Sequence, residues 1–167
     1  MNYELFLLIN KTLLISFSLD LVTNKYCIIK NDFFKQFTIW NIISMVLDCY
    51  NKQVIMNNIT IFVLFHSLFI LDSDLMFKIP KRCNISYMTF HLMNIVLHIL
   101  PVVYSMVYIR SNNIIINNND IIDNMLYFFT WGAYVNFDYS LYSIDKHYYK
   151  YLYLIYFSCL MGYRVLI

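Results

Sequence analysis

The sequence has few charged residues and only two glycines and two prolines. Of its 167 residues, 13% are charged and 60% are hydrophobic. So small a polar fraction cannot cover the surface of a water-soluble globule of this size. The net charge of +2 is also too small for a nucleic-acid-binding surface. We therefore expect an integral membrane protein with one transmembrane domain, residues 1–167, and with no nucleic-acid partner.

Motifs for metal, redox and soluble-enzyme chemistry are missing as well. The cysteines are far apart and form no CxxC pair, so neither a zinc site nor a redox motif is expected. The sequence contains no glycine-rich phosphate loop, no HExxH and no GxSxG. We therefore predict a site that uses no metal and no organic cofactor.

Apolar segments separated by short polar runs occupy most of the sequence. A bilayer core needs about 20 apolar residues per helix. Six candidate segments are found, at residues 5–23, 37–49, 54–71, 87–109, 125–144 and 151–167. The first lacks the basic start of a signal peptide, and the second is short and contains Asp48. The predicted fold class is all-α, a polytopic membrane helix bundle of about six transmembrane helices, or five if the second segment is interfacial.

The polar runs between the segments differ in charge. Most of the Lys and Arg residues lie in the first, third and fifth runs. By the positive-inside rule these runs face the cytosol. Three asparagines begin N-x-S/T sequons whose glycosylation would report the lumenal side, namely Asn10, Asn58 and Asn84.

The fourth segment carries polar residues in a membrane-length apolar stretch. Asn94 and His98 are four residues apart and share one helix face, so the amide can orient the imidazole. His98 is predicted close to the bilayer midplane, where a polar group usually faces a bundle interior or a cavity. The alternative is an interhelical hydrogen bond that only holds the bundle together.

Thr38 stands in KQFTIWN at the head of the second segment. A threonine in this position is most often a helix cap. An alcohol and an imidazole in one membrane cavity are nevertheless sufficient for nucleophilic attack on an ester, because the imidazole can take the hydroxyl proton.

Four motifs in a fixed order carry a family resemblance. KQFTIWN is similar to a K-x-x-T-x-x-N element, with Lys35, Thr38 and Asn41 at the fixed positions. LFILDSDLMFKIP, residues 68–80, is similar to L-F-x-Y-D/N-R-D/E-L-x-Y-P. The third motif, N-H-x-M-H-T, is matched by Asn94 and His98. WGAYVNFDYSLY, residues 131–142, is similar to W-x-x-Y-x-x-G-x-W-V-Y-P.

In these motifs the chain resembles the androgen-induced-gene and androgen-dependent TFPI-regulating protein family, relatives of the rolling stone group. The resemblance implies a six-helix protein of the endoplasmic reticulum or another endomembrane. It also implies a threonine hydrolase that acts on fatty acid esters of hydroxy fatty acids, with the nucleophile at Thr38 and the histidine at His98. The motifs differ from this chain at Ile95, Ile99 and Ser140, among other positions.

The leading hypothesis is a membrane hydrolase of a lipid ester, with Thr38 as the nucleophile and His98 as the general base and later acid. Supporting roles are assigned by position: Asn41 belongs to the first motif, Asn94 orients the imidazole, and the acyl channel is lined by Trp131, Tyr134 and Phe137, with Asp138 as a further cavity residue. The alternative is a non-catalytic multi-pass protein, such as an assembly or fusion factor. A third possibility is a small membrane-complex subunit that requires a protein partner.

Overall fold

The computed structural model describes residues 5–6, 8–13, 15–16, 36–47, 52–138 and 144–166. Within these ranges every regular element is a helix, as composition and patterning predicted. Part of the first predicted segment, as well as Lys35 and Asp48, lies outside the described residues.

Two described helices are long and apolar enough to cross a bilayer. The first is α4, Lys52–Leu71, whose 20 residues span about 30 Å at 1.5 Å per residue. The second is the continuous helix Tyr87–Asn112. It consists of α6 (Tyr87–Asn94), a π-helical turn η2 (Ile95–Ile99) and α7 (Leu100–Asn112). The shorter helix α3, Phe37–Val46, is apolar but has only ten residues.

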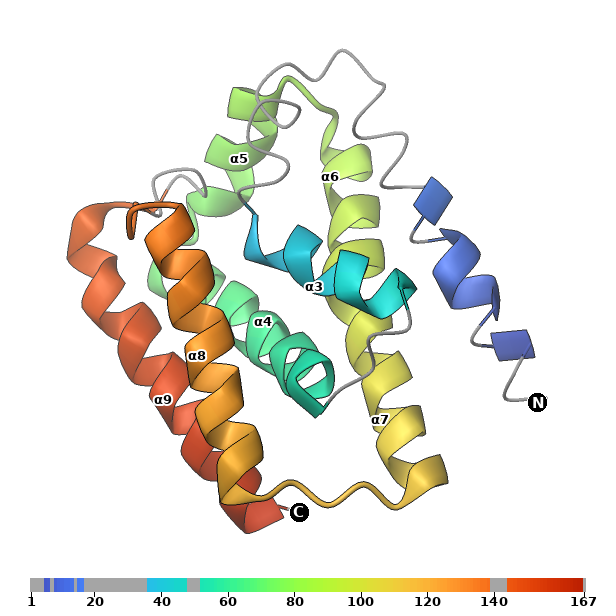
Figure 1. Ribbon diagram of the computed structural model, residues 1–167. Coiled ribbons are helices and arrows are strands. Elements are labelled where there is room, and N and C mark those ends of the chain that lie inside the picture. Colours follow the sequence, from blue (N-terminus) through green and yellow to red (C-terminus); the bar gives the residue numbers. More distant parts are fainter. Residues whose placement is uncertain are drawn as a thin grey trace.

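Helix α4 lies at the centre of the bundle (Figure 1). The helices α3, α7, α8 (Asn118–Tyr134) and α9 (Tyr149–Leu166) all pack against it. α8 and α9 run antiparallel on one side of α4, the long helix formed by α6, η2 and α7 runs along the other, and α3 crosses between them (Figure 1). α4 is thus the element that brings the remaining helices to one site.

Two helical regions differ from the predicted segments because their starts are polar. α8 begins before residue 125, since Asn117 and Asp120 form a capping box that satisfies the first backbone N–H groups. The third polar run contains a helix as well, α5, Leu75–Cys83, which ends at Asn84 in the left-handed conformation. A hydropathy criterion overlooks both features.

The π-helical turn η2 directly precedes the only proline of its long helix. Pro101 has no backbone N–H, and its ring would clash with the carbonyl of Leu97 in a regular α-helix. A π-helical turn widens the backbone at this point, which relieves the clash. The helix therefore continues through Pro101 and carries His98 in its irregular turn.

Helix α4 buries three polar side chains in the middle of the bundle, namely Asn57, Asn58 and Thr60. Asn58 donates to Ser105 Oγ at 2.8 Å and accepts from Asn41 Nδ2. Because its side chain is buried and hydrogen-bonded, Asn58 is not accessible for glycosylation. Of the other two sequons, Asn10 is buried and Asn84 is exposed.

A second set of hydrogen bonds joins the opposite side of α4 to α8 and α9. Asn124 Nδ2 donates to Asn57 Oδ1 at 2.7 Å, and the Tyr156 hydroxyl donates to Asn124 Oδ1 at 2.8 Å. One turn further on, the Thr60 and Tyr163 hydroxyls lie 3.0 Å apart. These bonds satisfy polar groups that are costly to bury.

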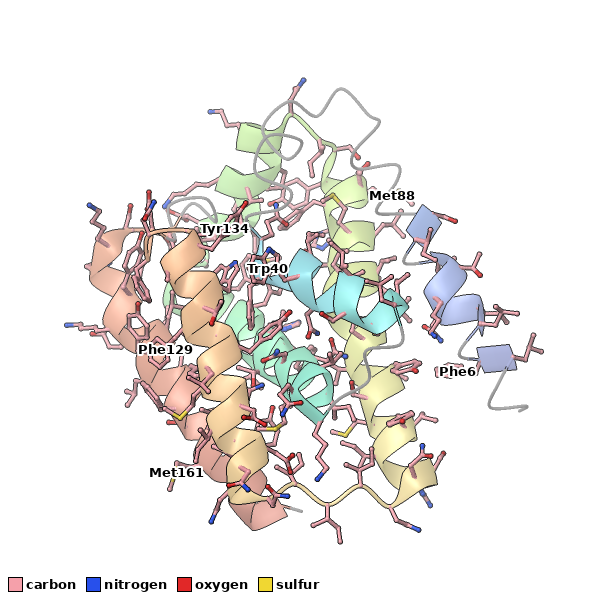
Figure 2. The ribbon with its side chains drawn as sticks, viewed as in Figure 1. Phe6, Trp40, Met88, Phe129, Tyr134 and Met161 are labelled. Carbon is pink, nitrogen blue, oxygen red and sulfur yellow. The ribbon has the colours of Figure 1, made fainter. Side chains whose placement is uncertain are left out.

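The outer faces of the long helices, in contrast, are apolar (Figure 2). Exposed apolar side chains recur at helical spacings of three, four, seven or eight residues. They are Leu92, Ile95, Val103 and Met106 on the continuous helix, Ile122, Leu126 and Phe129 on α8, and Leu154, Phe157 and Met161 on α9.

Candidate functional site

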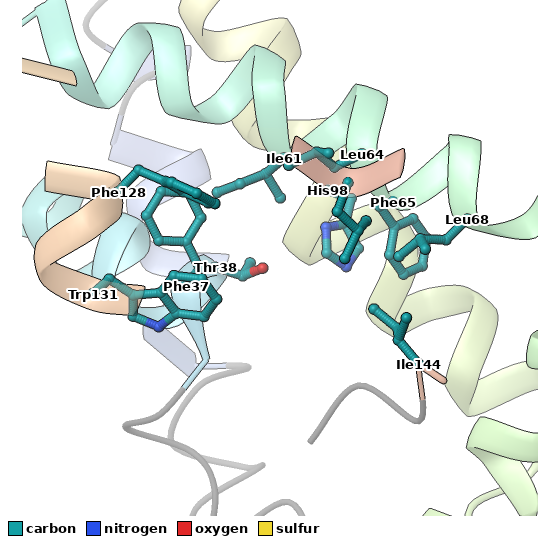
Figure 3. A pocket seen from close by; sticks show the side chains of 11 residues that line it. Phe37, Thr38, Ile61, Leu64, Phe65, Leu68, His98, Phe128, Trp131 and Ile144 are labelled. Atoms are coloured by element: carbon teal, nitrogen blue, oxygen red, sulfur yellow. The ribbon is translucent and has the colours of Figure 1, made fainter. Parts of the chain in front are cut away.

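A cavity of about 80 Å³ lies between α3, α4, η2, α8 and the start of α9. Its walls are almost entirely apolar, and Thr38 and His98 bring a hydroxyl and an imidazole to it (Figure 3). The lining residues are Phe37, Thr38, Ile61, Leu64, Phe65, Leu68, His98, Phe128, Trp131, Ile144 and Leu152. The two residues that the sequence singled out as nucleophile and base therefore share one cavity.

Thr38 reaches the cavity from the first turn of α3. The Gln36 side chain makes no capping hydrogen bond to this turn, and the side chain of Thr38 is buried. Figure 3 shows the Thr38 hydroxyl pointing toward the His98 ring. The N–H groups of Ile39 and Trp40 in this turn donate to the Gln36 carbonyl oxygen, at 3.0 and 3.2 Å, and the helix dipole makes this end of α3 positive. Thr38 is thus a hydroxyl at the positive end of a short helix, in an apolar surrounding.

His98 reaches the cavity from the π-helical turn of the continuous helix. Its ring stacks on Phe65 of α4, with ring centroids 3.8 Å apart and 16° between the planes. The ring atom Nδ1 is buried and has no hydrogen-bond partner. A π-helical turn often marks a functional position in a helix. The imidazole is therefore oriented by stacking, and Nδ1 is not engaged by any described residue.

Asn94 and Asn41 lie near the cavity but do not line it. Asn94 is half-buried, and its side chain makes no bond to His98 Nδ1. The proposed orientation of the imidazole by Asn94 therefore receives no support at that atom. Asn41 is fully buried and donates to Asn58 Oδ1, while its own Oδ1 has no partner. It belongs to the hydrogen-bond network of α4.

The four residues predicted for the last motif occupy different surroundings. Trp131 lines the cavity and packs on Phe37, with ring centroids 4.9 Å apart. Tyr134 is exposed and packs on Trp40 (Figure 2). Phe137 is also exposed and covers Gly132. Asp138 is exposed and accepts a hydrogen bond from the Tyr149 hydroxyl at 3.2 Å. Of these four, the structure brings only Trp131 to the cavity.

The apolar wall on α4 was not singled out by the sequence analysis. Its members, Ile61, Leu64, Phe65 and Leu68, follow one another at spacings of three and four residues. This spacing places them on one helix face, so the pattern itself contained the signal. The sequence pattern did not indicate, however, that this helix face lines a cavity.

No group of three or more His, Cys, Asp or Glu side chains in the described ranges could hold a metal ion. A hydroxyl and an imidazole in a water-poor cavity can instead carry out acyl transfer, with the hydroxyl as nucleophile and the imidazole as proton acceptor. Comparisons of the chain with protein-family models, with curated proteins and with solved structures gave no match.

Proposed function

We propose that the protein is a multi-pass membrane hydrolase that cleaves a lipid ester with Thr38 and His98. The observation that carries this proposal is that both side chains line the same apolar cavity, although they come from different helices. A pair of packing residues has no need to meet at an opening, whereas a nucleophile and its base do.

The distribution of polar and apolar side chains supports a membrane location. Amide and hydroxyl groups are hydrogen-bonded around α4 in the interior, and apolar side chains cover the outer faces of the continuous helix, α8 and α9. In water, so large an exposed apolar surface would be unfavourable, but in lipid it is the expected exterior.

Charged pairs at the two ends of α4 support the same conclusion. Lys52 pairs with Asp120 at 2.8 Å at one end, and Asp72 pairs with Lys78 at 3.2 Å beyond the other. Between Lys52 and Asp72, α4 contains no Asp, Glu, Lys or Arg. This spacing matches one bilayer core between two polar interfaces. The positive-inside rule favours a cytosolic position for the end that carries α5 with Lys78 and Lys81.

The reaction follows the general course of covalent ester hydrolysis. His98 accepts the hydroxyl proton as Thr38 Oγ1 attacks the ester carbonyl carbon. The carbon–oxygen bond to the alcohol breaks, and the imidazolium gives its proton to the departing alkoxide. Water then attacks the acyl-threonine ester and passes a proton to His98, which returns it to Thr38 Oγ1 as the acid leaves. The positive N-terminal end of α3, which carries Thr38, favours the negative charge of the oxyanion.

The family resemblance supports the same assignment of roles. It implies an endomembrane threonine hydrolase with its reactive pair at Thr38 and His98. One departure from its motifs has a structural explanation: Phe137 stands at the glycine position of W-x-x-Y-x-x-G and adopts a φ of 52°, a left-handed conformation that glycine tolerates best. The backbone at this position thus agrees with the motif even though the residue differs.

Four variants test the proposal. We expect Thr38→Ala and His98→Ala to abolish hydrolysis of a lipid ester by the purified protein, and Thr38→Ala to abolish labelling by a fluorophosphonate probe. Thr130→Ala and His91→Ala are matched controls, because both side chains are exposed and lie outside the cavity. Full hydrolysis by both cavity variants would show that the mechanism is wrong.

A second candidate function is a non-catalytic multi-pass protein. The observation that favours it is the buried network of Asn41, Asn57, Asn58 and Asn124, which shows that this bundle uses polar side chains to join helices. In that case Thr38 and His98 would also only pack helices together. The unaltered protein would then hydrolyse no ester, and the same variants would change only the stability of the fold.

A further inference from the structure

We propose that the substrate is a lipid ester with a short acyl group, of about two to four carbons, and that Phe128 sets this limit. This inference rests on the hydrolysis proposed above and adds the class of substrate. It differs from the long acyl chain that the family resemblance implies. The argument depends on the size of the cavity, on the rigidity of one wall and on the position of the reactive pair.

The cavity is small for a lipid-binding site. A cavity of about 150 Å³ holds one benzene molecule, and sites for drug-sized ligands measure about 300 to 1,000 Å³. At about 80 Å³, the cavity beside Thr38 and His98 has roughly half the volume of a cavity that holds benzene. It therefore has room for an acetyl, propionyl or butyryl group, and a chain of eight or more carbons exceeds it.

Three aromatic rings form the wall on the Thr38 side of the cavity (Figure 3). Phe37, Phe128 and Trp131 pack on one another, with ring centroids between 4.9 and 5.7 Å apart. Phe128 also stacks on Tyr156, at 4.0 Å and 18°, and the hydroxyl of Tyr156 is fixed by Asn124. Because Phe128 packs against Tyr156, Phe37 and Trp131, its ring is held in place and does not readily swing aside to lengthen the cavity.

The cavity is open on one side, so it can enclose only one part of the ester. We assign the enclosed part to the acyl group, because the acyl carbon lies beside Thr38 Oγ1 and His98 and the acyl group remains on Thr38 after the alcohol leaves. The alcohol part is under no such restriction and can extend into the surrounding lipid. The products are then a short-chain acid, released by water, and a lipid alcohol.

The test uses p-nitrophenyl acetate, butyrate and octanoate, which share a leaving group and differ in acyl length. For the full chain in detergent, we expect kcat/KM for octanoate to be at least about tenfold below that for butyrate. Phe128→Ala should raise the octanoate-to-acetate ratio by at least about tenfold, because it removes one ring from the wall. Phe129→Ala is the matched control: this neighbour lies on the outer face, 37% exposed, whereas Phe128 is 5% exposed. Partitioning of the octanoate ester into micelles is the same for every variant. A change in the octanoate-to-acetate ratio between variants therefore reports a change in the size of the cavity.

Phe128→Leu provides a second variant that keeps most of the core volume, and it should shift the ratio in the same direction by a smaller factor. Equal rates for butyrate and octanoate in the unaltered protein would overturn the inference. The inference would also be overturned if both Phe128 variants lowered kcat/KM for all three esters by the same factor. Absence of hydrolysis with every ester would overturn the proposed function together with this inference, whereas hydrolysis without a chain-length limit would overturn the inference alone.

Discussion

The imidazole of His98 lies flat against the ring of Phe65, with centroids 3.8 Å apart. Phe65 comes from the central helix α4 and His98 from the π-helical turn of the neighbouring helix. No hydrogen bond fixes the imidazole at Nδ1. In many hydrolases a carboxylate holds the catalytic imidazole in place. In the hydrolase proposed above, the aromatic face of Phe65 would take the orienting part of that task without adding a charge to the bundle interior.

Replacing Phe65 should therefore impair catalysis more than binding. We expect Phe65→Leu to lower kcat by about tenfold with little change in KM, because the imidazole loses its orientation relative to Thr38. Phe62→Leu is the control, since Phe62 lies on α4, packs on His66 and does not line the cavity. Steady-state kinetics on one ester measures both constants. An unchanged kcat in Phe65→Leu would mean that the stacking is incidental.

His98→Leu should abolish hydrolysis and at the same time stabilise the fold. A buried polar atom without a partner costs about 1 to 3 kcal/mol, and leucine fills a similar volume without that cost. We expect the free energy of unfolding to rise by about 1 kcal/mol. His66→Leu should bring no such gain, because His66 Nδ1 lies 2.8 Å from the Phe62 carbonyl oxygen. Unfolding in detergent measures both variants. A marked loss of stability in His98→Leu would indicate a structural role for the imidazole.

The positions of the long helices follow from hydropathy, which is why α4 and the continuous helix agree closely with the predicted segments. Helices with polar ends do not follow from it. The capping box of Asn117 and Asp120 starts α8 inside an asparagine-rich run that had been interpreted as a loop. In the same way, Asn57 and Asn58 stand within an apolar segment. Only the packing of the neighbouring helices shows that Asn57 hydrogen-bonds to Asn124 and Asn58 to Ser105.

The meeting of Thr38 and His98 at one cavity could not have been derived from spacing, because they lie on separate helices. The resemblance implied it, and the depth of Thr38 depended on where α3 begins. Side chains at helix ends were the hardest to place. α8 ends at Tyr134, and the chain then turns through the left-handed residues Asn136 and Phe137. Phe137 is thereby carried away from the cavity and onto Gly132.

The amide pair between α4 and α8 should contribute measurably to stability. Asn124→Leu leaves Asn57 Oδ1 without its donor and removes the side-chain acceptor of the Tyr156 hydroxyl, which keeps the backbone carbonyl oxygen of residue 124, so we expect a loss of about 2 kcal/mol. Asn57→Leu and the double variant complete a cycle, whose coupling energy should be about 1 kcal/mol. Asn118→Ala, at an exposed position of α8, is the control. Additive single effects would show that the bond contributes nothing net.

Acid should weaken the end of the bundle where α4 meets α8. Partial burial alone would raise the pKa of Asp120, but hydrogen bonds from Lys52 and the Asn117 backbone, with the Lys52 charge, hold that pKa below its usual range. A depressed folded-state pKa gives stability that is present above the unfolded value, about 3.9, and is lost as the pH falls through the folded value. Protonation of Asp120 below about pH 4 should therefore lower the free energy of unfolding by about 1 kcal/mol, and we expect Asp120→Asn to remove this contribution to the acid sensitivity. Asp123→Asn is the control, because Asp123 accepts from the neutral Gln53 side chain.

The turn after α8 should tolerate glycine and reject alanine at position 136. Asn136 has a φ of 53° and is exposed, so a substitution there changes backbone strain with little change in packing. We expect Asn136→Ala to cost about 1 kcal/mol in the free energy of unfolding and Asn136→Gly to be neutral or stabilising. Asn112→Ala is the control, because Asn112 is exposed but helical, where alanine is favourable. If alanine and glycine at position 136 gave equal stabilities, the left-handed conformation would not be required at this position of the turn.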